Sequence, residues 1–263
     1  MGIELEDMRA VLRALKLTGI LPSGRMLVLG SAIIHFGGVD LKRLASQEEV
    51  DLKKAPPEIL TLKGLGGCLG FNNVETLDIN GLTTITHDLT LPLPKELIEQ
   101  FDLVVDAGVL FWVSSPGRAL SNIFHLCSTG GIIVHITAVS GYYGRGYWNI
   151  HPRLFEDFYL STNAAKFLLC SYRCKPRERK RNCFALLTKI AIRLNLIKRF
   201  KNTTWYYVRG HIYLSNAKRK SISFSPATAP HEADMIPNNV IGTFGFQKLL
   251  TSITSMPKQI SNL

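Results

Sequence analysis

The stretch from Phe101 to Thr137 constrains the fold more than any other part of the chain. A short apolar segment leads into Asp106-Ala107-Gly108, a helical pattern follows, and a Gly130-Gly131 turn begins a second apolar segment. Two such strands joined by a helix indicate parallel neighbours in a sheet that is covered on both faces. Ligands of such sheets bind just beyond the carboxyl ends of the strands. We therefore expect residues 106–109 and 137–141 to line a cleft.

The rest of the pattern extends this pair of strands into an α/β protein. Residues 25–30 form an apolar strand that ends in a glycine, and residues 4–18 carry apolar side chains at helical spacing. The sequence predicts a Rossmann-like, doubly wound, mostly parallel seven-stranded sheet with helices on both faces. Besides the opening pair, strands are expected at 25–30, 73–79, 84–88, 167–172 and 205–214, and helices at 4–18, 40–69 (broken at Pro56-Pro57), 94–100 and 153–161.

At 263 residues, the chain is long enough for one α/β domain with additions. We expect this domain over residues 1–215, with a basic insertion at 173–203 between the last two strands. Residues 216–263 are rich in Ser, Thr, Pro, Asn and Lys with weak periodicity, and they predict a loosely packed C-terminal tail.

The net charge of +11 comes almost entirely from the insertion, because residues 173–201 hold eleven Lys or Arg and one acid, Glu178. Apolar residues then recur at helical spacing from Phe184 to Ile197. One interpretation is a surface helix docked on the domain with a solvated basic face. The other is that residues 175–201 contact an anionic membrane surface or a polyanion. Aromatic side chains do not alternate with these charges, so no specific nucleic-acid partner is predicted.

Residues 1–16 carry acids and lack the continuous apolar core of a signal peptide, and no apolar run reaches the length of a membrane span. The five cysteines form an odd set without the spacing of metal ligands, which predicts reduced thiols. We therefore expect a cytoplasmic protein, with peripheral membrane contact through the basic insertion as the alternative, and no metal site.

Three acids, Asp78, Asp88 and Asp106, each lie at or near the end of a predicted strand. A carboxylate there can accept hydrogen bonds from ribose hydroxyls, and one further along can accept from the exocyclic amine of adenine. Each could instead cap the following turn or helix. Three such acids at successive strand ends favour a ligand of the nucleoside type.

Other enzyme classes lack their motifs here. The segment after Gly30 does not match G-x-G-x-x-G, and Asp78 follows Gly30 by 48 positions rather than about 20. Both observations argue against an ordinary nicotinamide-dependent dehydrogenase. Sequence motifs of P-loop enzymes, serine hydrolases and zinc proteases are also missing.

Two further features could contact a ligand. His35 follows the first strand, where it would either contact the ligand or make a local hydrogen bond. The loop at 140–152 is rich in glycine and aromatic residues, and it would either stack on a ligand and close the cleft or pack on the following helix. Its candidate residues are Tyr142, Tyr143, Tyr147, Trp148 and His151.

The ordered motifs LVLG, LDI, THDL, FDLVVDAGVL and GRGYWNIHPRLFEDFY resemble those of class I S-adenosylmethionine-dependent methyltransferases. More narrowly, they are similar to small bacterial methyltransferase-like proteins with the pattern LDI, HDL, FDLV-DGGTLEHV and GHGFYNFSP. The resemblance covers residues 25–159, a little over half of the chain.

The resemblance implies a role for each matching position. Gly30 would lie under the methionine part of S-adenosylmethionine, Asp78 would bind its ribose hydroxyls, and Asp88 would bind its adenine. Asp106 and Gly108 would border the methyl-donor end. The substrate-side loop would contribute Gly144, Gly146, Tyr147 and Asn149.

The chain departs from the family pattern at Phe111-Trp112, where the family carries Glu-His. Two hypotheses follow. The first is an S-adenosylmethionine-dependent methyltransferase that acts on a small-molecule or glycan acceptor; because the sulfonium is itself activated, no particular catalytic residue is implied. The second is a catalytically silent binding scaffold that docks through the basic insertion. A cleft filled by Trp112 would favour the scaffold, and an open cleft would favour the enzyme.

Overall fold

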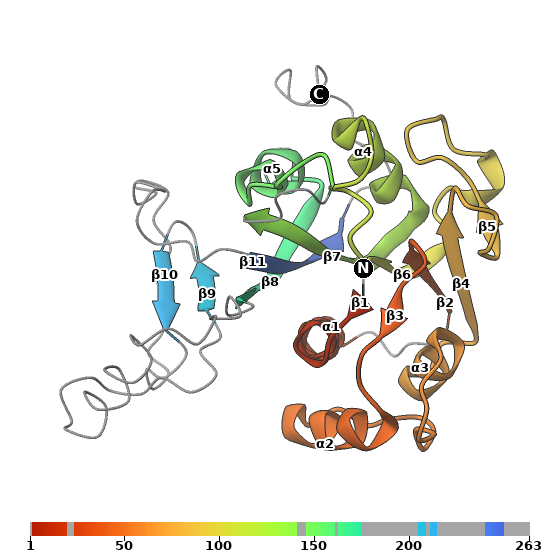
Figure 1. Ribbon diagram of the computed structural model, residues 1–263, viewed down its shortest axis with the longest axis vertical. Coiled ribbons are helices and arrows are strands. Elements are labelled where there is room, and N and C mark those ends of the chain that lie inside the picture. Colours follow the sequence, from red (N-terminus) through yellow and green to blue (C-terminus); the bar gives the residue numbers. More distant parts are fainter. Residues whose placement is uncertain are drawn as a thin grey trace, which may run out of the picture.

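A computed structural model describes residues 2–19, 24–140, 146–160, 163–174, 205–208, 211–214 and 240–249. Within these ranges, the main sheet has nine strands in the order β10-β9-β8-β11-β7-β6-β2-β4-β5, and helices cover both of its faces (Figure 1). Its strands are β2 (Arg25–Leu29), β4 (Asn73–Asp78), β5 (Ile85–Thr86), β6 (Phe101–Asp106), β7 (Cys127–Ser140), β8 (Ala165–Cys174), β9 (Trp205–Val208), β10 (His211–Leu214) and β11 (Val240–Lys248).

The helices are α1 (Leu5–Thr18), α2 (Gly38–Glu48), α3 (Leu62–Leu69), α4 (Pro116–Leu126) and α5 (Arg153–Phe155), together with the 3-10 helix η1 (Lys95–Leu97) and the π-helix η2 (Glu156–Leu160). A second, two-stranded parallel sheet pairs β1 (Gly2–Ile3) with β3 (Ile33–Ile34).

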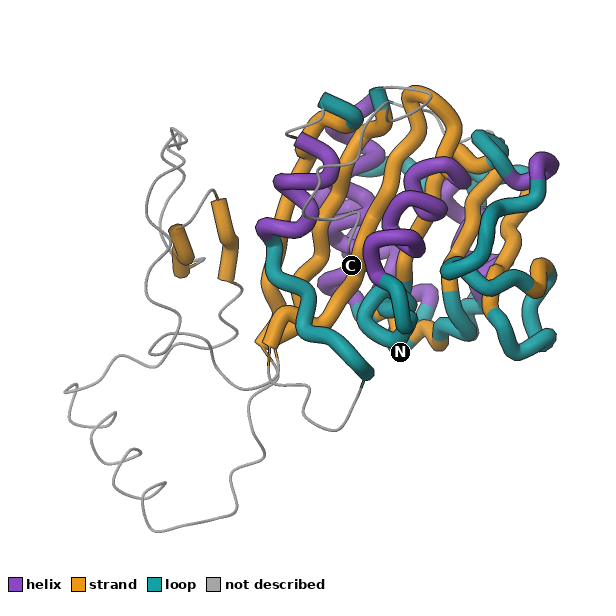
Figure 2. The backbone as a smooth tube through the Cα atoms, turned by 90° about the horizontal axis from the view of Figure 1, so that it is seen from above, coloured by secondary structure: helices purple, strands orange, loops and turns teal. Residues whose placement is uncertain are grey.

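The strands β5, β4, β2, β6 and β7 lie side by side in this order and are parallel to one another. Side chains alternate between the two faces, as the period of a strand requires. In β2, Leu27 and Leu29 join the apolar cluster that contains α4, α5 and η2, whereas Met26 and Val28 join the cluster that contains α1, α2 and α3. Figure 2 shows the strands enclosed between these helices. The carboxyl ends of the parallel strands therefore meet at one edge of a sheet that is buried on both faces.

Two predicted helix ends are confirmed. Helix α1 ends at Gly19, and α3 ends at Gly70; both glycines have a positive φ, 64° and 104°. A left-handed residue of this kind is the usual way for a helix to stop. The predicted helical region at 40–69 consists of two helices, α2 and α3, on either side of Pro56-Pro57.

The seventh strand of the predicted sheet lies elsewhere than expected. Strand β11, within the predicted tail at 216–263, inserts between β7 and β8 and is antiparallel to both. Its residues alternate as a fully buried strand should: Phe244 and Phe246 join the cluster around α4, whereas Ile241 joins the cluster around α1. The polar composition of the whole segment hid this short apolar pattern. The predicted tail thus contributes an inner strand to the domain.

The prediction of one long strand over 205–214 is wrong. These residues contribute two four-residue strands, β9 and β10, which pair with each other in an antiparallel arrangement. Tyr172 and Trp205 pair β9 with β8, so β9 and β10 extend the edge of the sheet instead of filling its interior.

Smaller differences concern the ends of elements. The predicted strand at 84–88 is the two-residue β5, and the predicted helix at 153–161 is one turn of α-helix followed by the π-helix η2. The basic insertion lies outside the described residues from position 175 to 204. Within the described ranges, no helix combines the length and the apolar character that a bilayer crossing needs.

Candidate functional site

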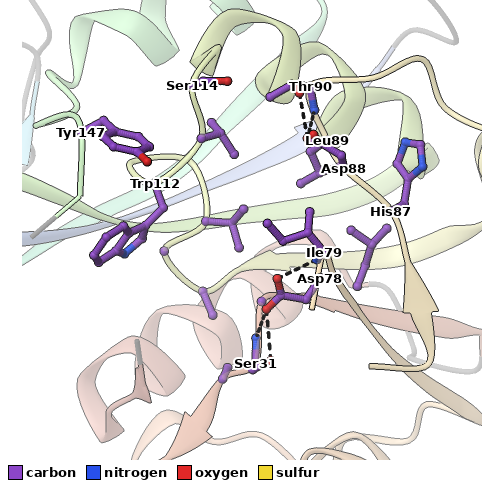
Figure 3. A pocket seen from close by; sticks show the side chains of 17 residues that line it. Ser31, Asp78, Ile79, His87, Asp88, Leu89, Thr90, Trp112, Ser114 and Tyr147 are labelled. Carbon is purple, nitrogen blue, oxygen red and sulfur yellow. Dashed lines mark hydrogen bonds between the residues drawn. The ribbon is translucent and has the colours of Figure 1, made fainter. Parts of the chain in front are cut away.

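A cavity of about 570 Å³ lies where β2, β4, β5 and β6 reach their carboxyl ends, which is where ligands of open α/β sheets bind. Pockets for small ligands commonly measure roughly 300–1,000 Å³. Its two sides differ in character (Figure 3): Asp78, His87 and Asp88 lie on one side, and Trp112 and Tyr147 lie on the other.

Gly30 places two stretches of backbone close together in the cavity wall. Its φ is +83°, and a Cβ at this position would lie 2.9 Å from Cγ2 of Val109. Its amide donates to the carbonyl of Leu77 at 2.8 Å, which fixes the turn after β2 against the end of β4. A residue with a side chain would therefore have a strained backbone at this position, and its Cβ would also collide with the Val109 side chain. Gly30 lines the cavity.

Asp78, the last residue of β4, also lines the cavity. Its Oδ2 accepts hydrogen bonds from the amide of Ser31 at 3.0 Å, from the Ser31 hydroxyl at 3.1 Å and from Nδ2 of Asn80 at 3.2 Å. Its Oδ1 accepts from the amide of Ile79 at 2.7 Å (Figure 3). This arrangement orients the carboxylate at the junction of the turns that follow β2 and β4.

Asp88 lies on the same side of the cavity, in the turn after β5. Its Oδ1 accepts hydrogen bonds from the backbone amide and the hydroxyl of Thr90, each at 2.8 Å. These two bonds, the backbone one first, hold the pKa of Asp88 below its ordinary value. His87 lines the cavity as well, and its buried Nε2 has no hydrogen-bond partner within the described part of the chain.

Asp106 does not line the cavity, in contrast to the prediction. It is fully buried, and both of its carboxylate oxygens have partners within the protein. Its Oδ1 accepts from the amide of Val109 at 2.7 Å, and its Oδ2 lies 3.0 Å from Nδ1 of His135. The neighbouring Gly108 does line the cavity, with a φ of +87°. The predicted pair is therefore divided between the cavity wall and the core behind it.

The departure from the family pattern does not block the cavity. The Phe111 side chain is buried in the core, whereas Trp112 is 49% exposed and forms part of the cavity wall. The carbonyl of Phe111 accepts from the amides of Tyr147 at 2.8 Å and Trp148 at 3.2 Å. A Cβ on Gly146 would lie 2.4 Å from the Phe111 ring, so a glycine is needed at this close approach.

The remaining predicted residues divide into three groups. Tyr147 lines the cavity, whereas Asn149 and His151 do not; instead, Nδ1 of His151 accepts from the amide of Arg153 at 3.1 Å and fixes the start of α5. The exposed His35 does not line the cavity either, because it follows β3 and packs beside Gly2. The predicted residues Tyr142, Tyr143 and Gly144 lie outside the described residues.

Sequence reasoning missed Ser31, His87 and Thr90, which line the cavity. Each lies within two residues of a predicted site residue. Ser31 follows Gly30, and His87 and Thr90 lie on either side of Asp88. Proximity to a strand end was thus the signal that could have identified them. Among the described residues, no three His, Cys, Asp or Glu side chains gather in a way that could hold a metal ion.

No family model and no curated protein matches the chain. Solved structures do match, and three illustrate the range. Phosphoethanolamine N-methyltransferase 2 of Haemonchus contortus, in complex with phosphomonomethylethanolamine and S-adenosylhomocysteine, is 14% identical with a TM-score of 0.40; the match covers 93% of this chain and 53% of that one. The chain thus spans about half of the length of that enzyme.

A methyltransferase of Thermotoga maritima that depends on S-adenosylmethionine is 12% identical with a TM-score of 0.34, and the match covers 93% of this chain and 92% of that one. The third match is a mutein of the branched-chain polyamine synthase of Thermus thermophilus in complex with N4-aminopropylspermidine and 5'-methylthioadenosine. It is 12% identical with a TM-score of 0.41, and the match covers 94% of this chain and 57% of that one. Because these values are low, we base the fold assignment on the strand order.

The seven strands from β5 to β8 follow the order β5-β4-β2-β6-β7-β11-β8, in which β11 runs antiparallel to its neighbours. This mixed, mostly parallel sheet is typical of class I S-adenosylmethionine-dependent methyltransferases. The chain has the methyltransferase-like Rossmann fold of this class.

Proposed function

We propose that the chain binds S-adenosylmethionine in the cavity and transfers its methyl group to a small-molecule or glycan acceptor. One observation carries the proposal: Gly30, Asp78, Asp88 and Gly108, which lie at or just beyond the carboxyl ends of four neighbouring strands, all line the same cavity. These are the positions to which the family resemblance gives cofactor contacts.

The residues present fit this cofactor. Asp78 offers carboxylate oxygens to ribose hydroxyls, and the apolar side chains of Ile79 and Leu89 line the same side as Asp88, where a flat base would bind. Gly30 has no side chain, so its own backbone borders the cavity beside the Val109 side chain. When bound, S-adenosylmethionine supplies an activated methyl group. The chain's own residues would bind and orient the two reactants and exclude water.

The opposite side of the cavity suits the acceptor. Trp112, Ser114 and Tyr147 lie there, on two segments that are tied together by the bonds from the amides of Tyr147 and Trp148 to the carbonyl of Phe111 and by the 2.8 Å bond from Nε1 of Trp148 to the carbonyl of Val113. Because Trp112 forms a wall and leaves the cavity open, its position favours the enzyme over the silent scaffold. Docking through residues 175–201 stays a prediction.

Calorimetric titration with S-adenosylmethionine and S-adenosylhomocysteine tests the proposal. We expect both to bind the wild-type protein and Asp78→Asn to bind them about tenfold to a hundredfold more weakly, because charge-assisted hydrogen bonds would be lost. The control is Asp51→Asn, an exposed site away from the cavity, which should bind as the wild type does. Failure of both compounds to bind, or equal binding by Asp78→Asn, would refute the proposal.

A further inference from the structure

Three buried polar side chains form a chain of hydrogen bonds behind the cavity wall. Nδ1 of His135, on β7, lies 3.0 Å from Oδ2 of Asp106, and Nε2 of His135 lies 2.9 Å from the hydroxyl oxygen of Tyr159, on η2. All three residues have no exposed surface, and none of them lines the cavity. They therefore cannot contact a bound molecule directly.

One end of this chain fixes the cavity wall. Oδ1 of Asp106 accepts the amide of Val109 at 2.7 Å and the amide of Leu110 at 3.4 Å. Gly108 lies between the end of β6 and these two residues, and its left-handed φ of +87° gives the turn its shape. Residues 107–109 all line the cavity, and Val109 also faces Gly30. The Asp106 carboxylate therefore sets the shape of the wall from behind.

The other end is anchored in the aromatic core. The Tyr159 ring stacks on Phe246 with 4.5 Å between ring centroids, and the His135 ring stacks on Phe155 at 4.7 Å. Because Asp106 accepts as a carboxylate, we assign the proton of His135 to Nδ1, so that Nε2 accepts from the Tyr159 hydroxyl. Burial raises the pKa of Tyr159 well above its ordinary value, so this side chain stays a neutral phenol.

We propose that Asp106, His135 and Tyr159 are positioning residues: they hold the turn at 107–109 in the shape that the cofactor requires, without touching the cofactor. This inference rests on the proposed function. Tyr159 lies on the π-helix η2, and such segments are frequent at functional sites. The chain of bonds connects η2, which follows the substrate-side loop, with the cofactor side of the cavity.

The test removes links of the chain one at a time. Tyr159→Phe deletes only a hydroxyl, which is linked to the Val109 amide through three successive hydrogen bonds. His135→Asn retains an amide that can donate to Asp106, in contrast to His135→Ala. The matched control is Thr243→Val, which deletes a buried hydroxyl that donates to Oδ1 of Asp7 at 2.8 Å on the α1 side of the sheet. The Kd for S-adenosylhomocysteine and the unfolding temperature are measured for each variant.

We expect Tyr159→Phe to raise the Kd about twofold to tenfold, the range for one hydrogen bond. His135→Ala should bind more weakly than His135→Asn. Thr243→Val should lower the unfolding temperature but leave the Kd unchanged, which separates positioning from general stability. A wild-type Kd in both Tyr159→Phe and His135→Ala would overturn the inference.

Hydrogen exchange of residues 107–110 in the free protein gives a second readout that does not depend on the cofactor. Faster exchange in Tyr159→Phe than in Thr243→Val supports the positioning role, because the substituted hydroxyl does not itself touch this turn. Unchanged exchange overturns it. If the wild-type protein binds neither S-adenosylmethionine nor S-adenosylhomocysteine, the proposed function fails, and the exchange rates alone then decide the positioning role.

Discussion

At the scale of single residues, Gly30 is the position where a minimal change should affect both stability and binding. We expect Gly30→Ala to lower the free energy of unfolding by about 1–3 kcal/mol, because a non-glycine residue at a φ of +83° is strained. The added Cβ would also press on Val109 and move the cavity wall. Urea unfolding gives the stability change, and calorimetry with S-adenosylhomocysteine gives the loss of affinity.

A second glycine provides the control. Gly67 lies inside α3, and a Cβ there would meet nothing within 4 Å. Gly67→Ala should therefore stabilise the protein by about 0.5–1 kcal/mol through the helix preference of alanine, without a change in binding. A loss of stability in Gly67→Ala similar to that in Gly30→Ala would show that the strain argument is wrong.

The strand-end acids show how far the sequence could predict the site. Asp78 and Asp88 line the cavity, as expected, but Asp106 is buried. The local pattern identifies the end of a strand and therefore the edge where a ligand binds. It does not reveal that His135, on the neighbouring strand, lies within hydrogen-bond distance of the carboxylate. That partner is set by the register between β6 and β7, which is a property of the sheet and not of either segment alone.

At the scale of elements, the end of β11 depends on an ion pair. Lys248 is fully buried; its Nζ lies 3.0 Å from Oε1 of Glu99 and 2.8 Å from the carbonyl oxygen of Cys127. The hydrogen bond from Lys248 is the main reason that the pKa of Glu99 is lowered from its ordinary value of 4.5. We expect Glu99→Gln to destabilise the protein by about 1–2 kcal/mol at neutral pH, since a buried ammonium loses its counter-charge while the partly exposed carboxylate is partly screened.

The pH dependence of this effect has a definite sign. A carboxylate whose pKa is lowered by folding stabilises the protein above its unfolded pKa, and the contribution is lost as the pH falls through the folded pKa. The difference in unfolding temperature between wild type and Glu99→Gln should therefore be largest near neutrality and shrink below pH 4.5. Glu49→Gln, which breaks an exposed pair with Lys16, should change stability by less than about 1 kcal/mol at any pH. A constant difference across this range would contradict the assignment.

The parallel strands and the first helices could be predicted because each carries its own signal, an apolar run or a helical period that ends in glycine. The last strand of the sheet could not. Residues 205–214 have the stronger β propensity, with Trp, Tyr and Val in succession, whereas β11 contains Gly242 and Gly245. Gly242 is suited to its crowded position, since a Cβ there would lie 2.5 Å from the Phe244 ring. Strand propensity is a weaker guide than burial between two existing strands.

At the scale of the whole molecule, the position of β11 changes where the domain ends. We expect a chain truncated after residue 215 to lack cooperative unfolding, because β7 and β8 would lose the strand that pairs with both of them. A chain truncated after residue 249 should keep cooperative unfolding and the affinity of the full chain for S-adenosylhomocysteine. Circular dichroism during thermal unfolding distinguishes the two. Cooperative unfolding of the shorter chain would show that β11 is dispensable.

The same strand also determines the order of events during synthesis. Phe244 pairs with His135 on one side and with Cys170 on the other, so both partners leave the ribosome long before the strand that joins them. Until then, two apolar strands present unpaired backbone edges, which are the surfaces through which nascent chains aggregate. Contacts this distant in sequence also slow folding. The sheet therefore stays incomplete until β11 has left the ribosome and pairs with β7 and β8.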